Sequence, residues 1–397
     1  MKYILFCLIL FITVTHARAA AKQDTANLIT SLLAKHPEWF ESVLSQQQIY
    51  QPQIIYTAIH RDAKHKPVFK TYRFHADEYF FYAASWMKLP LAVFTLEQLE
   101  QLHLSKDDIL TISPQRGYAP EEWAEAKQIR PCSFAQIITE AMVVSNNAAY
   151  NLMYDFLGAD LINRRFHELG YQKAVVCNRF SGCDSLGHCV CNPLNVTDAR
   201  TGKILHTQQL CYLKNTYRST YSTPFFGAFH WENGFLMPGP KNFTQRNYIP
   251  LSEMHRFITE LFFPNATHSK MKLSAENYAF IKKAMRMLPR NCPRPKYSEA
   301  AYPDAYMKPM IIGGTKNRLP NSIKIYNKVG QYFGWTCDNA YVIDTSAKVE
   351  FILSVVIYTN SKQAVADDPQ GYAQIAIPFI SNLGKVFYDY ELSLHQK

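Results

Sequence analysis

Apolar and polar residues recur along this chain with two different periods, which separate its ends from its middle. Alternation with a period of two predicts strands over 53–60 and 68–75, and the polar turn 61–67 between them predicts a hairpin. Three more strands are predicted near the C-terminus, over 323–328, 339–344 and 349–359. The middle of the chain instead carries apolar residues at helical spacing, so strands open and close the sequence and helices lie between them.

The strongest helical pattern covers 85–102, where apolar residues recur three or four positions apart at Leu89, Val93, Leu96 and Leu99. Other helices are predicted over 25–46 with a break at Pro37, from Ser133 onward, and over 147–157, 159–169, 252–263, 274–288 and 371–388. The segment 178–248 differs, because it is rich in Cys, Gly, Pro, Asn and Thr and has one helix-like patch near 205–213. We expect it to be a long irregular segment.

This order of elements predicts an α+β fold with a three-layer α/β/α lobe. An antiparallel sheet is built from the N- and C-terminal segments and flanked by helices, and an all-helical lobe is inserted between them. The length of 397 residues allows one large domain or two, and the pattern favours one discontinuous domain. Its α/β lobe covers about 24–84 and 270–390, and its helical lobe about 85–269, with the Cys-rich insertion at about 178–248.

The first 19 residues have the composition of a secretory signal peptide. Lys2 provides a basic start, an apolar run follows over 3–14, and small residues stand at Ala17 and Ala19, where cleavage is expected. The alternative is an uncleaved anchor. Cleavage would leave a domain over 20–397, with no transmembrane span and a periplasmic or secreted localisation.

Charge adds little to this picture. Forty-two Lys and Arg against 32 Asp and Glu give a net charge of +10, which falls to +8 when Lys2 and Arg18 are removed. The basic residues are spread along the chain instead of forming one stripe, so we do not expect nucleic-acid binding. Anionic lipids or wall polymers are the alternative partners, and a solvated surface without a partner is the simplest interpretation.

Cysteine placement indicates an oxidising compartment. Removal of Cys7 with the signal peptide leaves an even number, which favours disulfides in an exported protein. The pairing is left open among Cys132, Cys177, Cys183, Cys189, Cys191, Cys211, Cys292 and Cys337. A zinc site at His188, Cys189 and Cys191 is the alternative, but this spacing matches no recognised zinc pattern, so neither a metal nor another cofactor is expected.

Ser85 and Lys88 open the strongest predicted helix. They lie three positions apart and therefore share a helix face. A serine at a helix start can act as a nucleophile if a neighbouring base takes its proton, and a lysine with a lowered pKa in a dry pocket can be that base. The spacing alone is weak evidence, because Ser269 and Lys272 repeat it without opening an apolar helix.

Ser145, Asn146 and Asn147 lie between two predicted helices. The hydroxyl of Ser145 could relay a proton between a nucleophile and a leaving group, and the carboxamide of Asn147 could bind a substrate amide. The alternative is a structural loop in which Asn147 caps the following helix.

Lys328, Val329, Gly330 and Gln331 end a predicted strand. Lys328 offers a positive charge for a substrate carboxylate, and Gly330 lets the strand edge approach a ligand. The N–H of Gln331 could form an oxyanion hole with the N–H of Ser85. The alternative is a surface lysine beside a turn.

Taken in order, the three motifs resemble those of the penicillin-recognising serine hydrolases, most closely the class A β-lactamase-like family. The resemblance covers about 50–175 and 249–388. It implies that Ser85 is acylated with Lys88 as its base, and that Ser145 transfers the proton. It also implies that Asn147 contacts the acylamido group of the substrate and Lys328 its carboxylate.

The sequence departs from the family pattern at three places. Asn146 replaces the usual aspartate, and Val329 replaces a hydroxyl residue that would contact the carboxylate. The segment after Gly170 contains Arg179 but lacks the glutamate that activates the deacylating water in class A enzymes. Carboxylates that could substitute for it are Asp184, Asp198 and Glu232, although the sequence places none of them.

These features predict an exported serine hydrolase with an acyl-enzyme at Ser85, acting on a β-lactam or a related amide and deacylating slowly. The substrate is expected to be a small molecule or related to peptidoglycan. The alternatives are a D-alanyl-D-alanine peptidase-like or other small amide or ester hydrolase, and a non-catalytic binding protein that keeps the fold. The presence of both Lys88 and Ser145 disfavours the binding protein. The oligomeric state is left open.

Overall fold

The computed structural model describes residues 28–114, 131–180, 190–212, 221, 224–232, 235–360 and 364–395. The expected signal peptide (1–19) lies outside the described residues, as do Cys183, Asp184, His188 and Cys189. Within the described part of the chain, no helix has the length and apolar character that crossing a membrane requires.

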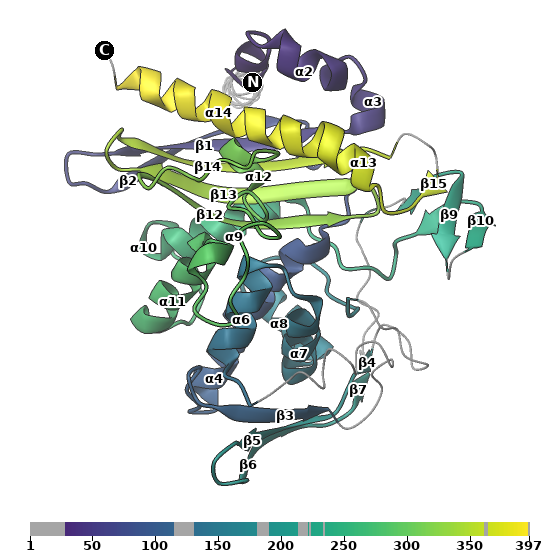
Figure 1. The fold of residues 1–397 in the computed structure, drawn as a ribbon, viewed down its shortest axis with the longest axis vertical. Helices are drawn as coiled ribbons and strands as arrows, with labels where there is room; N and C mark the ends of the chain where they lie inside the picture. Colours follow the sequence, from purple (N-terminus) through teal and green to yellow (C-terminus); the bar gives the residue numbers. More distant parts are fainter. Residues whose placement is uncertain are drawn as a thin grey trace, which may run out of the picture.

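A five-stranded antiparallel sheet forms the centre of the molecule, with the strand order β12–β13–β14–β1–β2 (Figure 1). Its strands are β1 (Gln53–Arg61), β2 (Pro67–Phe74), β12 (Ile323–Tyr332), β13 (Trp335–Asp344) and β14 (Val349–Tyr358). Because β1 pairs with β14, the two ends of the chain build one sheet, and the predicted α+β fold class is confirmed.

Helices cover both faces of this sheet (Figure 1). One face carries α14 (Ile377–Leu394) and, against that helix, α2 (Pro37–Leu44); the other carries α9 (Leu251–Phe262). Neighbouring residues of a strand point to opposite faces, so Ile54 joins the core beneath α14 and Ile55 joins the core beneath α9.

The helical lobe lies beyond α9 and provides the helices that reach the site (Figure 1). Its principal helices are α4 (Lys88–Gln101), α6 (Phe134–Val143), α7 (Asn147–Leu157), α8 (Ala159–Glu168) and α11 (Ala275–Arg286). Side-chain caps fix the starts of α6 and α11, since Ser133 Oγ accepts from the Gln136 N–H and Ser274 Oγ from the Asn277 N–H, both at 3.2 Å. The shorter helices are α3 (Gln47–Tyr50), α10 (Pro264–Thr267), α12 (Pro309–Ile312) and α13 (Pro369–Gly371), with a helical segment at 28–33.

The segment predicted to be irregular contains short strands. They are β4 (Val190–Cys191), β5 (Leu194–Asp198), β6 (Ile204–Gln208), β7 (Cys211–Tyr212), β8 (Phe225–Phe226), β9 (Phe229–Glu232), β10 (Phe235–Pro238) and β11 (Lys241–Asn242), with β15 (Ala364–Val365) beside β9. The helical patch predicted near 205–213 is wrong, because 204–208 form β6 and 211–212 form β7. Strand β5 pairs with β6 on one side and, on the other, with β3 (Leu110–Pro114), which comes much earlier in the sequence. These pairs satisfy the backbone hydrogen-bonding groups that a helix would satisfy internally.

No disulfide joins the described cysteines to one another, so the expected disulfides are not found among them. Cys132, Cys177, Cys292 and Cys337 are each buried, and Cys132 and Cys337 pack in the apolar core beneath α9. Cys191 and Cys211 are different, because they face each other across the β4–β7 pair.

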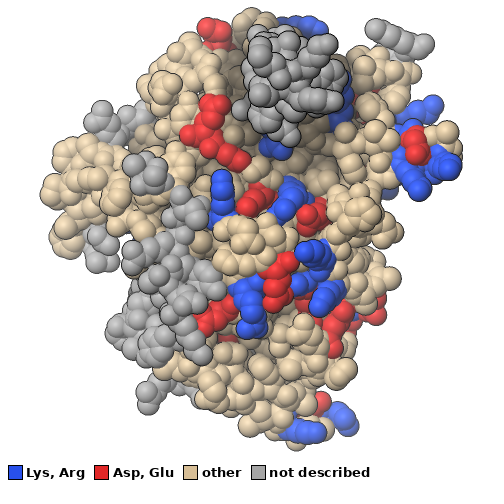
Figure 2. All heavy atoms as spheres, turned by 180° about the vertical axis from the view of Figure 1, so that it is seen from behind, with Lys and Arg blue, Asp and Glu red and all other residues tan. Residues whose placement is uncertain are grey.

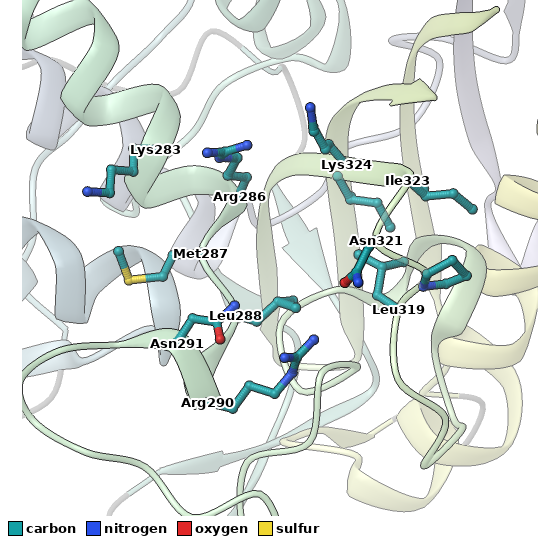
Figure 3. A pocket seen from close by; sticks show the side chains of 12 residues that line it. Lys283, Arg286, Met287, Leu288, Arg290, Asn291, Leu319, Asn321, Ile323 and Lys324 are labelled. Atoms are coloured by element: carbon teal, nitrogen blue, oxygen red, sulfur yellow. The ribbon is translucent and has the colours of Figure 1, made fainter. Parts of the chain in front are cut away.

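Acidic and basic side chains are interspersed on the rear face of the molecule (Figure 2). A surface pocket of about 330 Å³ lies between the end of α11 and the start of β12 (Figure 3). Leu288 and Leu319 line it together with the cations Lys283, Arg286 and Lys324. The predicted catalytic residues are not part of its lining.

Candidate active site

Ser85 and Lys88 lie at the junction between a 3₁₀ turn (Ala84–Met87) and α4. The α-helix was predicted to begin at Ser85, but it begins at Lys88. Pro90 lacks the N–H that would bond to the carbonyl of Trp86 in an α-helix. The preceding turn is therefore closed by 3₁₀ hydrogen bonds, which join residues three positions apart. In this geometry Lys88 Nζ lies 2.6 Å from Ser85 Oγ, within hydrogen-bonding distance.

Lys88 is fully buried, and its amine contacts three polar side chains. Besides Ser85, Nζ lies 2.8 Å from Asn147 Oδ1 and 3.3 Å from Ser145 Oγ. Burial, and secondarily the nearby charge of Lys328, lower the pKa of Lys88 well below its usual 10.5. Its surroundings therefore favour the neutral amine, which is the form that can accept a proton from serine.

The loop between α6 and α7 presents Ser145 to both lysines. Ser145 has a left-handed φ of 59°, a strained conformation that is common at functional sites. Asn146 caps α7 by accepting from the Ala149 N–H at 3.1 Å, and its Nδ2 donates to Glu140 Oε2 at 3.1 Å. The alternative in which Asn147 is the cap is therefore wrong, and Asn147 contacts Lys88 instead.

Strand β12 brings Lys328 to the same hydroxyl from the opposite side. Lys328 is buried, and its Nζ donates to Ser145 Oγ and to the Val329 carbonyl, both at 2.9 Å. Burial and then the charge of Lys308 lower the pKa of Lys328 to about 7. Ser145 therefore bridges two lysines whose charges disfavour each other.

Gly330 allows β12 to lie against the turn that carries Ser85. A Cβ at this position would come within 2.1 Å of the Ala83 carbonyl oxygen, so a larger residue would push the strand away from the nucleophile. The predicted strand ended at Lys328, whereas β12 continues through Gly330 and Gln331 to Tyr332. Gln331 thus follows the point of closest approach, and its side-chain Nε2 donates to Thr336 Oγ1 at 3.2 Å.

A buried polar cluster behind Lys328 was not predicted from the sequence. Lys308 Nζ donates to Asn327 Oδ1 at 2.7 Å, and Asn327 Nδ2 donates to Asp338 Oδ1 at 2.8 Å. Burial is the main cause that lowers the pKa of Lys308 to about 8 and raises that of Asp338 to about 6. Lys308 lies outside every predicted element, so no local pattern could have identified it.

Comparison with known proteins finds a family match for part of the chain. Residues 42–224 match the model of the β-lactamase enzyme family. The matched residues make up less than half of the chain. The resemblance of the motifs to the penicillin-recognising serine hydrolases is thereby confirmed. No curated protein matches the sequence.

Solved β-lactamase structures share the fold at low identity. A class A β-lactamase from Bacteroides cellulosilyticus DSM 14838 aligns with a TM-score of 0.50 and 13% identity, over 89% of this chain and 96% of that one. A β-lactamase from Desulfarculus baarsii DSM 2075 aligns with a TM-score of 0.51 and 15% identity, over 91% of this chain and 97% of that one. A third, from Chitinophaga pinensis DSM 2588, has a TM-score of 0.51 and 13% identity, over 88% and 97%.

In the candidate site, an aromatic ring occupies the space beside Lys88. Lys88 Nζ lies 4.8 Å from the centre of the Phe180 ring, which stacks on Tyr150 at a centroid distance of 3.9 Å. Asn151 fixes the position of Phe180, because its side chain bonds to both the N–H and the carbonyl of that residue, at 2.8 and 2.6 Å. The preceding Arg179 forms a buried ion pair with Asp155 at 3.2 Å.

Asp198, one of the carboxylates predicted as substitutes for the missing glutamate, lies in a turn away from the site. Asp198 accepts from the Arg200 and Thr201 N–H groups in the turn after β5, and Asp184 and the side chain of Glu232 are outside the described residues. Within the described chain, no carboxylate hydrogen-bonds to Ser85, Lys88 or Ser145. That part of the chain also places no group of three or more His, Cys, Asp or Glu side chains around a possible metal position.

Proposed function

We propose that the chain is an exported serine hydrolase that forms an acyl-enzyme at Ser85 on β-lactam or related amide substrates and releases it slowly. The contact that carries this proposal is the 2.6 Å approach of Lys88 Nζ to Ser85 Oγ in a buried site that lowers the pKa of the lysine. The β-lactamase family match and the fold support a hydrolase acting on a small molecule. Export rests on the leader-like first 19 residues.

Each predicted residue has a role in this reaction. The neutral Lys88 amine takes the Ser85 proton as Oγ attacks the substrate carbonyl, and the N–H groups of Ser85 and Gln331 stabilise the oxyanion. The C–N bond then breaks, and Ser145 passes the proton from Lys88 to the leaving nitrogen. Lys328 attracts the substrate carboxylate, and Asn147 binds its amide group.

Slow deacylation follows from the surroundings of Phe180. Hydrolysis of the ester requires a group that removes a proton from the attacking water. An aromatic ring can exclude water but cannot accept that proton, and Phe180 is fixed beside Lys88 by Asn151. Acylation should therefore outpace deacylation.

We expect a burst of about one product per enzyme with a chromogenic cephalosporin, followed by a slow steady state. Stopped-flow absorbance would measure both phases. Phe180→Glu should raise the steady-state rate at least about tenfold, because it adds a carboxylate near the ester that can activate water. Rapid linear turnover of the wild type without a burst would contradict slow deacylation.

Phe180→Gln is the matched control for this experiment. It has the size and polarity of the glutamate variant without its basicity, so its steady-state rate should stay close to that of the wild type. If Phe180→Glu and Phe180→Gln raise the steady-state rate equally, the gain comes from opening the site to water and not from a general base. A D-alanyl-D-alanine peptide, tested in the same way, would detect peptidase-like activity.

We also expect export to join Cys191 to Cys211. The two are direct partners in the β4–β7 pair, and the hydrogen bond between their thiols raises the pKa of Cys191 and lowers that of Cys211. A disulfide-bearing oxidant in the export compartment would accept the two electrons and two protons that the two thiols lose. Closing this loop of about 20 residues should stabilise the fold by about 3 kcal/mol.

Non-reducing peptide mapping and denaturant unfolding would test the bond. The oxidised chain should yield one linked peptide containing both cysteines, and Cys211→Ser should lose that peptide together with the added stability. Cys132→Ala is the control, since Cys132 is buried and has no cysteine as its strand partner. Free thiols at both positions in the oxidised, exported chain would contradict the prediction.

A further inference from the structure

A chain of buried hydrogen bonds crosses the sheet from the nucleophile's neighbour to the opposite edge. Trp86 Nε1 donates to Asn339 Oδ1 at 3.2 Å, and Asn339 Nδ2 donates to Ser354 Oγ at 2.6 Å. Ser354 Oγ lies 2.7 Å from His255 Nδ1, and Thr57 Oγ1 lies 2.7 Å from His255 Nε2. Thr57 Oγ1 also lies 2.8 Å from Thr71 Oγ1. We call this set the sheet relay: Trp86, Asn339, Ser354, His255, Thr57 and Thr71.

The sheet relay begins at the active site. Trp86 follows Ser85 in the chain, and Asn339 is the strand partner of Lys328 in the β12–β13 pair. It ends on β2, the opposite edge strand, where Thr71 is the strand partner of Thr57. The relay therefore passes β13, β14, β1 and β2 on the face that α9 covers.

The direction of these hydrogen bonds is fixed by their chemistry. An indole can only donate, so Asn339 Oδ1 must face Trp86 and its amide nitrogen must face Ser354. Among the described contacts, the acceptor available to the Ser354 hydroxyl hydrogen is His255 Nδ1. His255 then carries its hydrogen on Nε2 and donates to Thr57.

The last donor of the relay is exposed to a pocket. Thr57 donates to Thr71 Oγ1, so the hydroxyl hydrogen of Thr71 is left for whatever occupies the pocket of about 400 Å³ that it lines. Burial, with a smaller contribution from the charge of Arg73, lowers the pKa of His255 to about 3, so the imidazole stays neutral at physiological pH. The relay therefore presents a donor at its outer end.

The other pocket residues favour an anion at this position. Arg73 lies on β2 beside Thr71, is exposed, and makes no ion pair within the described part of the chain. Arg256 and Glu253 also line the pocket, but Arg256 pairs with Glu260 at 3.7 Å and donates to the Gly170 carbonyl at 2.8 Å, so Arg73 is the pocket cation that faces a ligand. Phe69 adds an aromatic wall. A carboxylate attached to an apolar group would meet a hydroxyl donor, a cation and a ring.

We propose that this pocket binds a small carboxylate with an apolar body, held by Arg73 and the hydroxyl hydrogen of Thr71, and that the sheet relay transmits its presence to Trp86. Each hydrogen bond of the relay strengthens its neighbour by polarisation, so a strong acceptor at Thr71 acts on all of them. The proposal goes beyond the reaction at Ser85, and binding can be measured without turnover.

Titration of the ¹⁵N-labelled mature chain with sodium benzoate, at constant ionic strength, would test this. The imidazole signals of His255 and the indole N–H of Trp86, assigned with Trp86→Phe, should shift together and saturate. Arg73→Gln and Thr71→Val should each raise the Kd at least tenfold. Arg200→Gln, which removes an exposed cation in the β5–β6 turn, should leave the Kd unchanged.

Several outcomes would overturn the proposal. The absence of a saturable shift, or an unchanged Kd in Arg73→Gln, would exclude this pocket; the second result would indicate binding elsewhere, such as at Lys328. Equal affinity for benzyl alcohol would exclude recognition of the carboxylate. A shift of His255 without a shift of Trp86 would exclude transmission through the sheet relay.

Discussion

Ser85→Ala is expected to abolish covalent labelling by a fluorescent penicillin, whereas the wild type should gain the mass of one intact penicillin. Lys88 Nζ lies 2.6 Å from Ser85 Oγ, which is close enough for the amine to act as the base for this hydroxyl. Removing Oγ removes the bond-forming atom itself, so the loss should be complete and not graded. Intact-protein mass spectrometry after brief incubation would measure the adduct directly.

The chain contains a matched control for this variant. Ser269 and Lys272 repeat the spacing of Ser85 and Lys88, but they open no helix, and Ser269 Oγ accepts from the Met271 N–H at 3.3 Å. Ser269→Ala should therefore be labelled like the wild type. If Ser85→Ala gains the same adduct as the wild type, the acyl-enzyme at Ser85 is wrong; if the wild type gains none, the non-catalytic alternative is favoured.

The residues of the site could be predicted because each lies in a short motif at the end of a strongly patterned element. Ser85 and Lys88 open the helix with the clearest apolar spacing, and Lys328 lies on an alternating strand. Their meeting at Ser145 was predicted from the family resemblance, since no local pattern specifies which strand end approaches which loop. Gly330 carries one physical signal, because a glycine in a strand often marks a close approach.

The sequence could not reveal what surrounds these residues. Lys308 and Asp338 become important only when β12 and β13 bury them beside Lys328, and burial is a property of the assembled fold. Phe180 resembles any core aromatic residue until α7 positions it against Lys88. The strands of 190–212 were missed for a related reason, because β5 takes its partner β3 from about 80 residues earlier in the chain.

The two lysines also define the state in which acylation can occur. Lys88 must be neutral to accept a proton, and Lys328 must be charged to attract a carboxylate. Burial disfavours the charged form of both, and each charge further disfavours a charge on its neighbours. Because both lie near Ser145 Oγ, they titrate as a coupled pair, and their apparent pKa values belong to that pair.

Lys88→Met is expected to lower the acylation rate constant by about 10²- to 10⁴-fold and to remove the rising part of its pH profile. In the wild type the rate should rise with pH as Lys88 loses its proton, at a pH below its usual pKa of 10.5. It should then fall as Lys328 loses its charge, with a pKa of about 7 in the free enzyme. Stopped-flow acylation across the pH range would measure both parts.

The stability of this variant separates a lost base from a lost fold. Burial holds the pKa of Lys88 below its unfolded value of 10.5, so its ionisation destabilises the folded state most at pH values below the folded pKa. This cost falls as the pH rises from the folded to the unfolded pKa. Methionine fills similar space without that charge, so Lys88→Met should melt no lower than the wild type, with its largest gain at low pH. Lys328→Arg should keep its positive charge above pH 7, so the fall of the acylation rate at high pH should disappear in this variant. A fall that persists would show that another group causes it. A rising part that persists in Lys88→Met would show that a different group accepts the serine proton.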